Sequence, residues 1–265
     1  KISGMLNGTS NFILSQMENG ADFDPTLKFA QEKGYAEPDP SFDIEGMDAA
    51  HKIGILSSIA IGTSLPPNDF YVEGIKDIDS TDFKYASKLG FSIKHLAVAS
   101  LTENEVQLRA HPVLVSSDSY LAGLKGVRNG IEVETDLVGT LHVAGSGAGQ
   151  ESTASGLISD LVYLSNVSSN SSINLNKRIK MNLQPIDEME FKYFFKIKTL
   201  SKHMDLNKIE KIFQKNQVSI SAENFDDFYI VIISESFIEN KKDSIMASLN
   251  NLSEVASVKS IRIEP

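Results

Sequence analysis

The sequence has 265 residues, 41% of them hydrophobic, which is enough for one large domain or two modest ones with cores of their own. A net charge of −10, from 25 basic and 35 acidic residues, argues against nucleic acid or an anionic membrane surface as a partner. The absence of cysteine excludes disulfides, thiolate metal sites and thiol catalysis, and the longest strongly apolar run, residues 53–61, is too short to span a bilayer.

Two short helices and a stiff acidic loop are predicted for the first 45 residues. Residues 9–19 form a helix that Thr9 or Ser10 can cap, and a second helix begins with Asp24 as its N-cap and ends at Gly34. Two prolines in the following loop forbid a regular helix there and hold the backbone extended. The loop contains four acidic residues: Glu37, Asp39, Asp43 and Glu45.

A largely buried helix is predicted to start near Gly46 and to run to about residue 61. Its apolar positions are Met47, Ala50, Ile53, Ile55, Leu56, Ile59 and Ala60. Asp48 and Lys52 are four residues apart and so share one face. Partial burial of a lysine lowers its pKa towards the range useful for proton transfer, which would make this pair an acid/base site for a substrate that bears an ammonium group. The alternative is a solvated acidic loop and an ordinary surface ion pair.

The middle of the chain combines strands with short helices. The predicted elements are a helix at 82–89, strands at 92–101 and 106–112, a short apolar segment at 113–115, one helical turn at 119–124, a hairpin at 126–134 around Asn129-Gly130, a strand at 140–143 and a helix from Thr153 to about 165. The loop Gly145–Gly149 between the last strand and helix is either a tight turn or an anion-binding helix start. The five histidines show no metal-ligand spacing, and no metal is expected.

The C-terminal part reads as a separate small domain. Residues 166–189 have the composition of a linker, and residues 190–265 follow the order strand–helix–strand–strand–helix–strand of a ferredoxin-like fold. The predicted fold class is therefore α+β: residues 1–165 form a mixed sheet with helices on one face, and a ferredoxin-like domain follows. The strand-rich middle leaves one sheet face uncovered, which favours pairing with a second copy of the chain.

Three motifs of this sequence occur together in one family. The first is the segment 2–14, and the third is Gly145–Gly149 with Ser152–Ser155 after it. The second is a Gly-Tyr-x-Glu-x-Asp-Pro loop, an Asp, then Gly-x-Asp-x-x-x-Lys, present here as Gly34, Tyr35, Glu37, Asp39, Pro40, Asp43, Gly46, Asp48 and Lys52. In this order the motifs resemble homoserine dehydrogenase.

The resemblance implies hydride transfer between NADP or NAD and the aldehyde carbon of L-aspartate 4-semialdehyde, giving L-homoserine for threonine and methionine biosynthesis. It implies Lys52 as proton donor and Asp48 as the residue that orients Lys52 or the substrate. The expected substrate-binding residues are Glu37, Asp43, Tyr35 and Thr9, and Gly149 is the expected cofactor-binding position. It also implies a cytoplasmic homo-oligomer, at least a dimer, that acts on a small molecule.

Two features depart from the family pattern. No Rossmann fingerprint is present, so the chain is expected to be the part of a longer enzyme that lacks the nucleotide domain, inactive alone. The alternative is a stand-alone small-molecule sensor or assembly module without catalysis. The C-terminal domain resembles an ACT regulatory domain loosely: Ser201–Asp205 lacks the usual Pro and Gly, so threonine is expected to bind weakly or not at all. A structural or dimerising role and amino-acid sensing both remain open for it.

Overall fold

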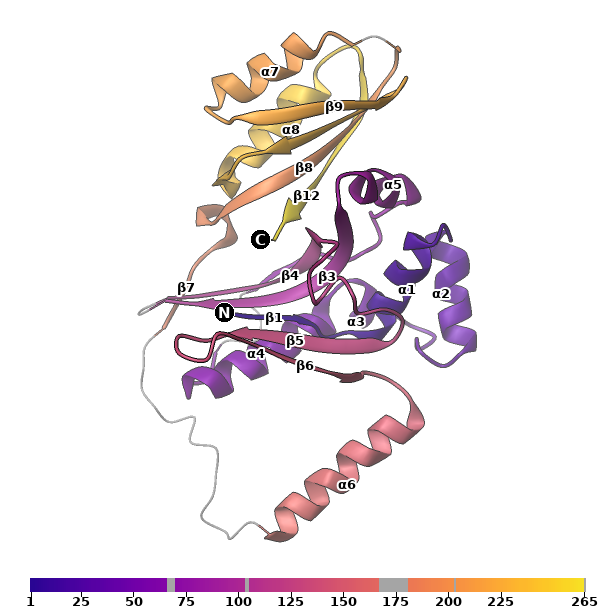
Figure 1. Cartoon of the computed structure of the whole chain (residues 1–265), viewed down its shortest axis with the longest axis vertical. Helices are drawn as coiled ribbons and strands as arrows, with labels where there is room; N and C mark the ends of the chain where they lie inside the picture. The colour runs from indigo at the N-terminus through magenta and orange to yellow at the C-terminus, as the bar shows by residue number, and fades with distance from the viewer. Residues whose placement is uncertain (66–69, 103–104, 167–180, 203, 265) are drawn as a thin grey trace. The chain divides into compact units, whose positions relative to one another are not determined.

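The computed structural model describes residues 1–65, 70–102, 105–166, 181–202 and 204–264, which form two compact units (Figure 1). The first unit comprises residues 1–80, 94–111 and 118–184. The second comprises residues 81–93, 112–117 and 185–265. The domain boundaries expected at residues 165 and 190 stay predictions, because contacts within a chain do not show which segment folds alone.

The first unit is built on a mixed sheet. Its main strands are β1 (Ile2–Met5), β3 (Phe91–Leu101), β4 (Glu105–Ser116), β5 (Arg128–Glu134) and β6 (Thr140–Ser146), in the order β6-β5-β1-β3-β4. β1 runs antiparallel to both of its neighbours. Two short strands, β2 (Tyr71–Val72) and β7 (Asn182–Leu183), pair in parallel with β4. The α+β fold class predicted from the sequence is confirmed.

Among the described residues, four helices precede β2, and a buried hydrophobic cluster lies between the last of them and the sheet. The helices are α1 (Gly8–Glu18), α2 (Phe23–Glu32), α3 (Ser41–Ile44) and α4 (Met47–Ile61). The cluster joins α4 to β1, β3 and β4 through these buried residues: Ile2, Leu6, Ala49, Ala50, Ile53, Ala97, Ala99, Val106, Leu108 and Ala110. Small residues on α4 and β3 let the helix approach the sheet closely, so the start of α4 has a fixed position on the sheet.

The prediction that α4 is largely buried is wrong at its apolar position Ala60 and at two large side chains, Ile55 and Ile59, all of which are exposed. The two isoleucine side chains are 61% and 47% exposed, and they follow Lys52 by three and seven residues, so they extend its face of the helix. The acidic loop is also not fully extended, since α3 follows directly after Pro40. A proline can precede a helix because the first helical N–H groups need no partner inside it. The second helix begins two residues earlier than predicted, with Asp22 instead of Asp24 at the N-cap.

The hairpin predicted around Asn129-Gly130 is wrong. Both residues lie within β5, and the chain turns at residues 135–139, where Thr135 N–H donates to the Gly139 carbonyl at 3.0 Å and Gly139 has a φ of +81°. Gly130 is required for a different reason: a Cβ there would lie 2.5 Å from Leu124 Cδ1. A close approach of side chain to backbone, and not a turn, therefore explains this glycine.

Two further helices complete the elements before the C-terminal strands. They are α5 (Ser80–Lys88) and α6 (Gln150–Asn166). α6 has no buried residue and exposes several large apolar side chains, namely Leu157, Ile158, Leu161, Val162, Tyr163 and Leu164. Among the residues that the structure describes, no helix is both long and apolar enough to cross a membrane. Pairing with a second copy stays a prediction. Of the predicted linker, residues 167–180 lie outside the described residues.

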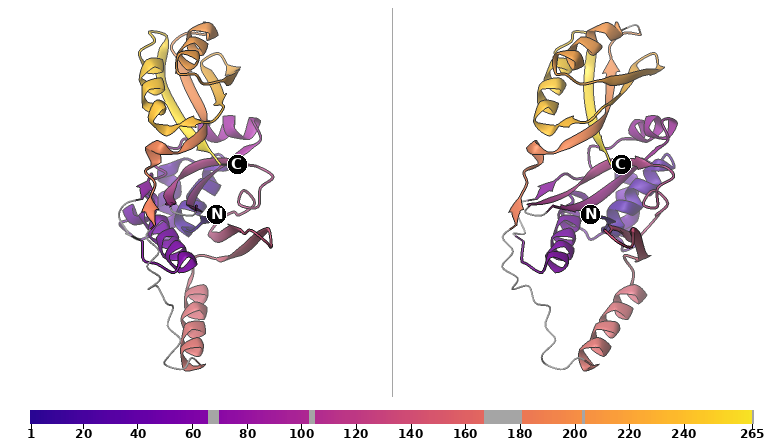
Figure 2. Two further views of the ribbon diagram at one scale, coloured as in Figure 1. Left: turned by 90° about the vertical axis from the view of Figure 1, so that its left-hand side faces the viewer. Right: turned by 60° about the vertical axis from the view of Figure 1, so that its left-hand side comes forward.

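The second unit has the order of a ferredoxin-like fold. Its elements are β8 (Glu190–Thr199), α7 (Leu206–Lys215), β9 (Ile220–Asp226), β10 (Tyr229–Ser234), α8 (Lys242–Asn250) and β12 (Val255–Ile263), with the short η1 (Ile186–Glu188), β11 (Phe237–Ile238) and η2 (Glu239–Lys241) between them. The strands lie in the order β12-β8-β10-β9, all antiparallel. Figure 2 shows α7 and α8 against one face of this sheet. Alternate residues of β8 point into the core there, as the sequence pattern predicted.

Candidate functional site

Asn7 connects three separate segments of the first unit. It lies between β1 and α1, and its side-chain Oδ1 accepts a hydrogen bond from the Ser10 backbone N–H at 2.7 Å, which caps α1. Its Nδ2 donates to Asp43 Oδ1 at 2.7 Å and to Asp48 Oδ2 at 2.8 Å. The first motif is thus joined directly to the two aspartates of the second. Nothing in the local sequence pattern around Asn7 indicates these long-range contacts, so no role was predicted for this residue.

Lys52 belongs to the same cluster. Its Nζ lies 2.7 Å from Asp48 Oδ2 and donates to the Leu6 carbonyl at 3.0 Å, so the expected pair within α4 is also tied to the end of β1. The Lys52 side chain is 46% exposed, which agrees with the predicted partial burial, and that of Asp48 is 19% exposed. The ammonium is therefore held in place and accessible at once.

The other residues predicted for the site lie nearby, with one exception. Thr9 Oγ1 donates to the Tyr35 carbonyl at 2.6 Å, and the Tyr35 ring packs edge-on against Phe12, with centroids 5.1 Å apart. Glu37 is exposed on the loop, and among the described residues no hydrogen bond joins its carboxylate to this cluster. Of the predicted substrate-binding residues, Glu37 is thus the one whose side chain no hydrogen bond in the described part of the chain holds at the site.

The backbone near the start of α4 is closely packed at two glycines, where a side chain would not fit. Gly46, the N-cap of α4, has a φ of +89°, and a Cβ there would lie 2.9 Å from His95 Nε2. A Cβ on Gly74 would lie 2.4 Å from the Ile44 carbonyl oxygen. Burial lowers the pKa of His95, so the ring is neutral and its Nε2–H donates to the Glu73 carbonyl at 2.9 Å. These contacts hold the backbone that presents Asp43 and Asp48.

The glycine loop Gly145–Gly149 approaches the same place. A Cβ on Gly8 would lie 3.6 Å from Ala148 Cβ, so the loop borders the first residue of α1, next to Asn7. Gly147 leaves no room for a side chain, since a Cβ would lie 2.3 Å from the Asn129 side chain. Gly149 itself has a φ of +119° and is exposed. All three sequence motifs therefore converge on the start of α1.

No group of three or more His, Asp or Glu residues in the described part of the chain could hold a metal ion. The Asn7–Asp43–Asp48–Lys52 cluster, called the Asn7 cluster below, instead combines two carboxylates, an amide and an ammonium. Such a set can bind a cationic amine, polarise a carbonyl group and transfer a proton. These are the chemical properties expected of a site for an amino-acid substrate.

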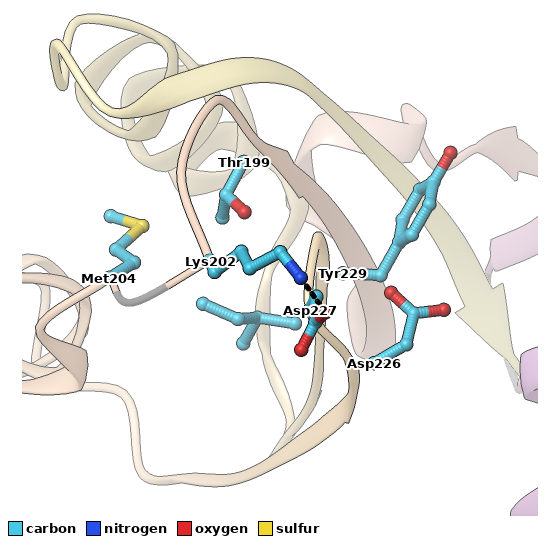
Figure 3. Close-up of a pocket in the computed structure, with 7 residues that line it drawn as sticks. Thr199, Lys202, Met204, Asp226, Asp227 and Tyr229 are labelled. Atoms are coloured by element: carbon cyan, nitrogen blue, oxygen red, sulfur yellow. Dashed lines mark hydrogen bonds and ion pairs between the residues drawn. The ribbon is translucent and has the colours of Figure 1, made fainter.

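A small cavity of about 120 Å³ lies in the second unit, at the loop after β8 (Figure 3). It is lined by Thr199, Lys202, Met204, Asp226, Asp227, Tyr229 and Ile230. Lys202 points at Asp227, with Nζ and Oδ2 2.5 Å apart and both side chains 59% exposed. A hydrogen bond from Tyr85 lowers the pKa of Asp226. The cavity is polar and open, and it occupies the region where the sequence lacks the Pro and Gly of a regulatory loop.

A second charged cluster lies inside the second unit and was not predicted. Arg262 donates to Glu239 twice, from Nε at 3.0 Å and from Nη2 at 2.7 Å, and Lys242 Nζ lies 2.6 Å from Glu239 Oε1. The Tyr193 hydroxyl donates to the same carboxylate. Tyr193, Arg262 and Glu239 are buried. We call this set the Glu239 cluster; it joins β8, η2, α8 and β12.

Comparison with known proteins agrees with the motifs. The family model described as homoserine dehydrogenase matches residues 1–162. A homoserine dehydrogenase of Pseudomonas aeruginosa is 37% identical over 280 residues, which cover 99% of this chain and 64% of that protein. One of Neisseria gonorrhoeae is 36% identical, covering 95% of this chain and 61% of that protein. The chain thus spans less than two thirds of the length of these relatives.

Solved structures agree as well. The crystal structure of a homoserine dehydrogenase from Thiobacillus denitrificans superposes with a TM-score of 0.90 at 34% identity, covering 99% of this chain and 63% of that one. A hyperthermophilic archaeal homoserine dehydrogenase mutant in complex with NADPH matches 64% of this chain with a TM-score of 0.50 at 27% identity. The first match includes both units of the chain.

Proposed function

The chain belongs to the homoserine dehydrogenase family, and we propose that it supplies the substrate-binding and catalytic part of an enzyme that interconverts L-aspartate 4-semialdehyde and L-homoserine. The reaction serves threonine and methionine biosynthesis. The observation that supports this proposal best is the Asn7 cluster, in which two carboxylates and an accessible ammonium are held together by contacts from three segments. The substrate has the complementary groups: an ammonium at one end and an aldehyde at the other.

Lys52 is the proton donor to the aldehyde oxygen and the base in the reverse direction. Reduction of an aldehyde places negative charge on its oxygen, and a nearby ammonium stabilises that charge and then neutralises it. Asp48 and the Leu6 carbonyl engage two of the three ammonium hydrogens, which leaves the third for the substrate. The exposure of the side chain keeps it within reach of a bound molecule.

The acidic residues hold the amino end of the substrate. Asp43 and Glu37 provide negative charge for the ammonium, and Tyr35 and Thr9 line the same end. Asp48 orients Lys52 through the 2.7 Å ion pair. Glu37, which lies on the exposed loop, reaches the substrate by adjustment of its side chain, since its carboxylate has no hydrogen bond to the cluster in the described part of the chain.

NADP or NAD supplies the hydride. The loop Gly145–Gly149 fits the nicotinamide end of such a cofactor, since Gly149 leaves the backbone open and Ala148 borders Gly8 beside the cluster. The archaeal relative that is described in complex with NADPH supports the choice of cofactor class. We expect the nucleotide-binding domain to come from residues outside this 265-residue sequence, and this chain alone to be inactive.

The remaining properties follow the family expectation. The enzyme is a cytoplasmic homodimer or higher homo-oligomer. The second unit is an ACT-like domain whose βαββαβ order supports the assignment. Its cavity offers no Pro-Gly turn for close contact with an effector, so we expect threonine to bind weakly or not at all, as calorimetry can test.

The test is an assay of a protein that joins this chain to a nucleotide-binding domain, with aspartate semialdehyde and either NADPH or NADH. Oxidation of the cofactor that depends on the aldehyde is the expected result. The Glu37→Ala variant should raise the Michaelis constant with little change in kcat, because the charge acts on the ground state and transition state alike. No turnover with either cofactor, together with tight binding of a small molecule, would instead indicate a sensor or assembly module.

A further inference from the structure

The side-chain amide of Asn7 uses every hydrogen-bonding group it has. Asn7 is 5% exposed, its oxygen accepts from Ser10 N–H, and its nitrogen donates to Asp43 and to Asp48. Because the oxygen is committed to the backbone donor, both amide hydrogens have to point at the carboxylates. The orientation of the amide is therefore fixed by its own contacts.

The amide of Asn7 links the two aspartates directly. Asp43 lies on α3 and Asp48 on α4, 36 and 41 residues after Asn7, and each places one oxygen within 2.8 Å of the same nitrogen. Two carboxylates at such a separation repel each other unless donors lie between them. Asn7 supplies one donor to each, and Lys52 supplies a further one to Asp48.

Helix capping alone does not require an asparagine here. Serine, threonine or aspartate would accept from Ser10 N–H equally well. Of the common capping residues, only asparagine combines an acceptor oxygen with two donor hydrogens in its side chain. An asparagine at position 7 is therefore explained by the hydrogen bonds to Asp43 and Asp48, and not by the capping bond from Ser10 N–H.

We propose that Asn7 is a positioning residue that holds Asp43 and Asp48 side by side as ionised acceptors, ready for the substrate ammonium and for Lys52. The role rests on the proposed function, since it assigns Asn7 a part in that reaction. Asn7 acts through the aspartates, because it is buried and both of its amide hydrogens are directed at their carboxylates.

Asn7→Asp is the informative change, because it keeps the cap and the size but replaces both donors by an acceptor. Three carboxylates then meet, and one of them takes up a proton or moves away. We expect kcat/KM to fall at least about tenfold, since loss of hydrogen bonds to charged groups has roughly that effect, and the acidic limb of its pH profile to shift upwards. Asn11→Asp is the matched control: Asn11 is 1% exposed on the same helix and donates to the Arg128 carbonyl at 2.9 Å, away from the carboxylates.

Measurements of the free energy of unfolding on the same protein test the role of Asn7 without relying on enzyme activity. The destabilisation caused by Asn7→Asp should be smaller when Asp43 is changed to Asn, and it should shrink as the pH falls from 7 to 4. The Asn11→Asp variant should show no coupling to the change at Asp43, because its side chain faces the Arg128 carbonyl instead. Coupling in unfolding without any dehydrogenase activity would sink the proposed function and leave the positioning of the aspartates standing. Equal kinetic effects of both variants, or no coupling, would overturn the role of Asn7.

Discussion

The Asn7 cluster and the Glu239 cluster each combine a lysine, carboxylate and hydrogen-bond donors, yet they differ in exposure. In the Glu239 cluster, one carboxylate receives bonds from Arg262, Lys242 and Tyr193, and the residues at its centre are buried. In the Asn7 cluster, the ammonium of Lys52 is half exposed and has two protein acceptors for its three hydrogens.

We interpret the difference as that between a structural cluster and the proposed reactive one. A buried carboxylate with three donors stabilises the fold only while every partner remains, because an unbalanced charge in the interior is costly. A half-exposed cluster that is anchored at one side keeps capacity for a ligand. Changes in the first should therefore affect stability, and changes in the second should affect turnover.

The largest effect is expected for Lys52→Ala. In a protein with a nucleotide-binding domain, kcat should fall by roughly 100- to 10,000-fold, the usual contribution of a general acid–base group, with a smaller change in KM. Alanine is compatible with helix α4, so the circular dichroism spectrum should be unchanged. Lys202→Ala is the control, because it removes the exposed Lys202–Asp227 pair of the second unit and should leave kcat unaltered. A Lys52→Ala protein that is unfolded would show that the ion pair is structural.

Glu239→Ala should produce the opposite pattern. Removing one partner of a buried ion pair costs roughly 3 to 5 kcal/mol, because the charge that remains is poorly solvated. The free energy of unfolding from denaturant titration should fall by this amount while KM stays unchanged. Glu235→Ala breaks the exposed Lys192–Glu235 pair in the same unit and should cost less than about 1 kcal/mol. Equal effects of the two changes would remove the distinction between the clusters.

Lys94 is a third kind of charged residue: it is buried, and no carboxylate of the described residues is bonded to it. Burial, followed by repulsion from Lys125, lowers the pKa of Lys94 to about 8, and its Nζ donates to the Leu124 carbonyl at 2.9 Å. The unfolded chain binds this proton more tightly than the folded one, so stability should increase as the pH rises from 8 to 10.5. Relative to Lys94→Met, the gain should be about 3 kcal/mol over that interval. If the difference in unfolding free energy between the two proteins stays constant over this pH range, the pKa of Lys94 is not lowered.

Sequence patterns predicted the elements that depend on local signals. The start of α4 at Gly46 and the shared face of Asp48 and Lys52 follow from residue types and spacing alone. The βαββαβ order of the second unit follows from alternation and capping in the same way. Each of these features is decided within a few residues of the chain.

The features that depend on distant segments were missed. The hairpin assigned to Asn129-Gly130 failed because Leu124 packs against that glycine, and an apolar helix pattern could not show that Ile55 and Ile59 face outwards. Asn7 is hydrogen-bonded to Asp43 and Asp48, which follow it by 36 and 41 residues, so these contacts become visible only in the folded chain. The resemblance to a family supplied residues of the site, but not the contacts that hold them.

The most direct measurement is a crystal structure, with L-homoserine bound, of a protein that joins this chain to a nucleotide-binding domain. The account predicts the hydroxyl oxygen of homoserine at about 3 Å from Lys52 Nζ, a hydrogen-bonding distance, with its ammonium against Asp43. Binding with the ammonium directed at Lys52, or binding only in the cavity around Lys202 and Asp226, would contradict the assignment of the Asn7 cluster as the site of the reaction.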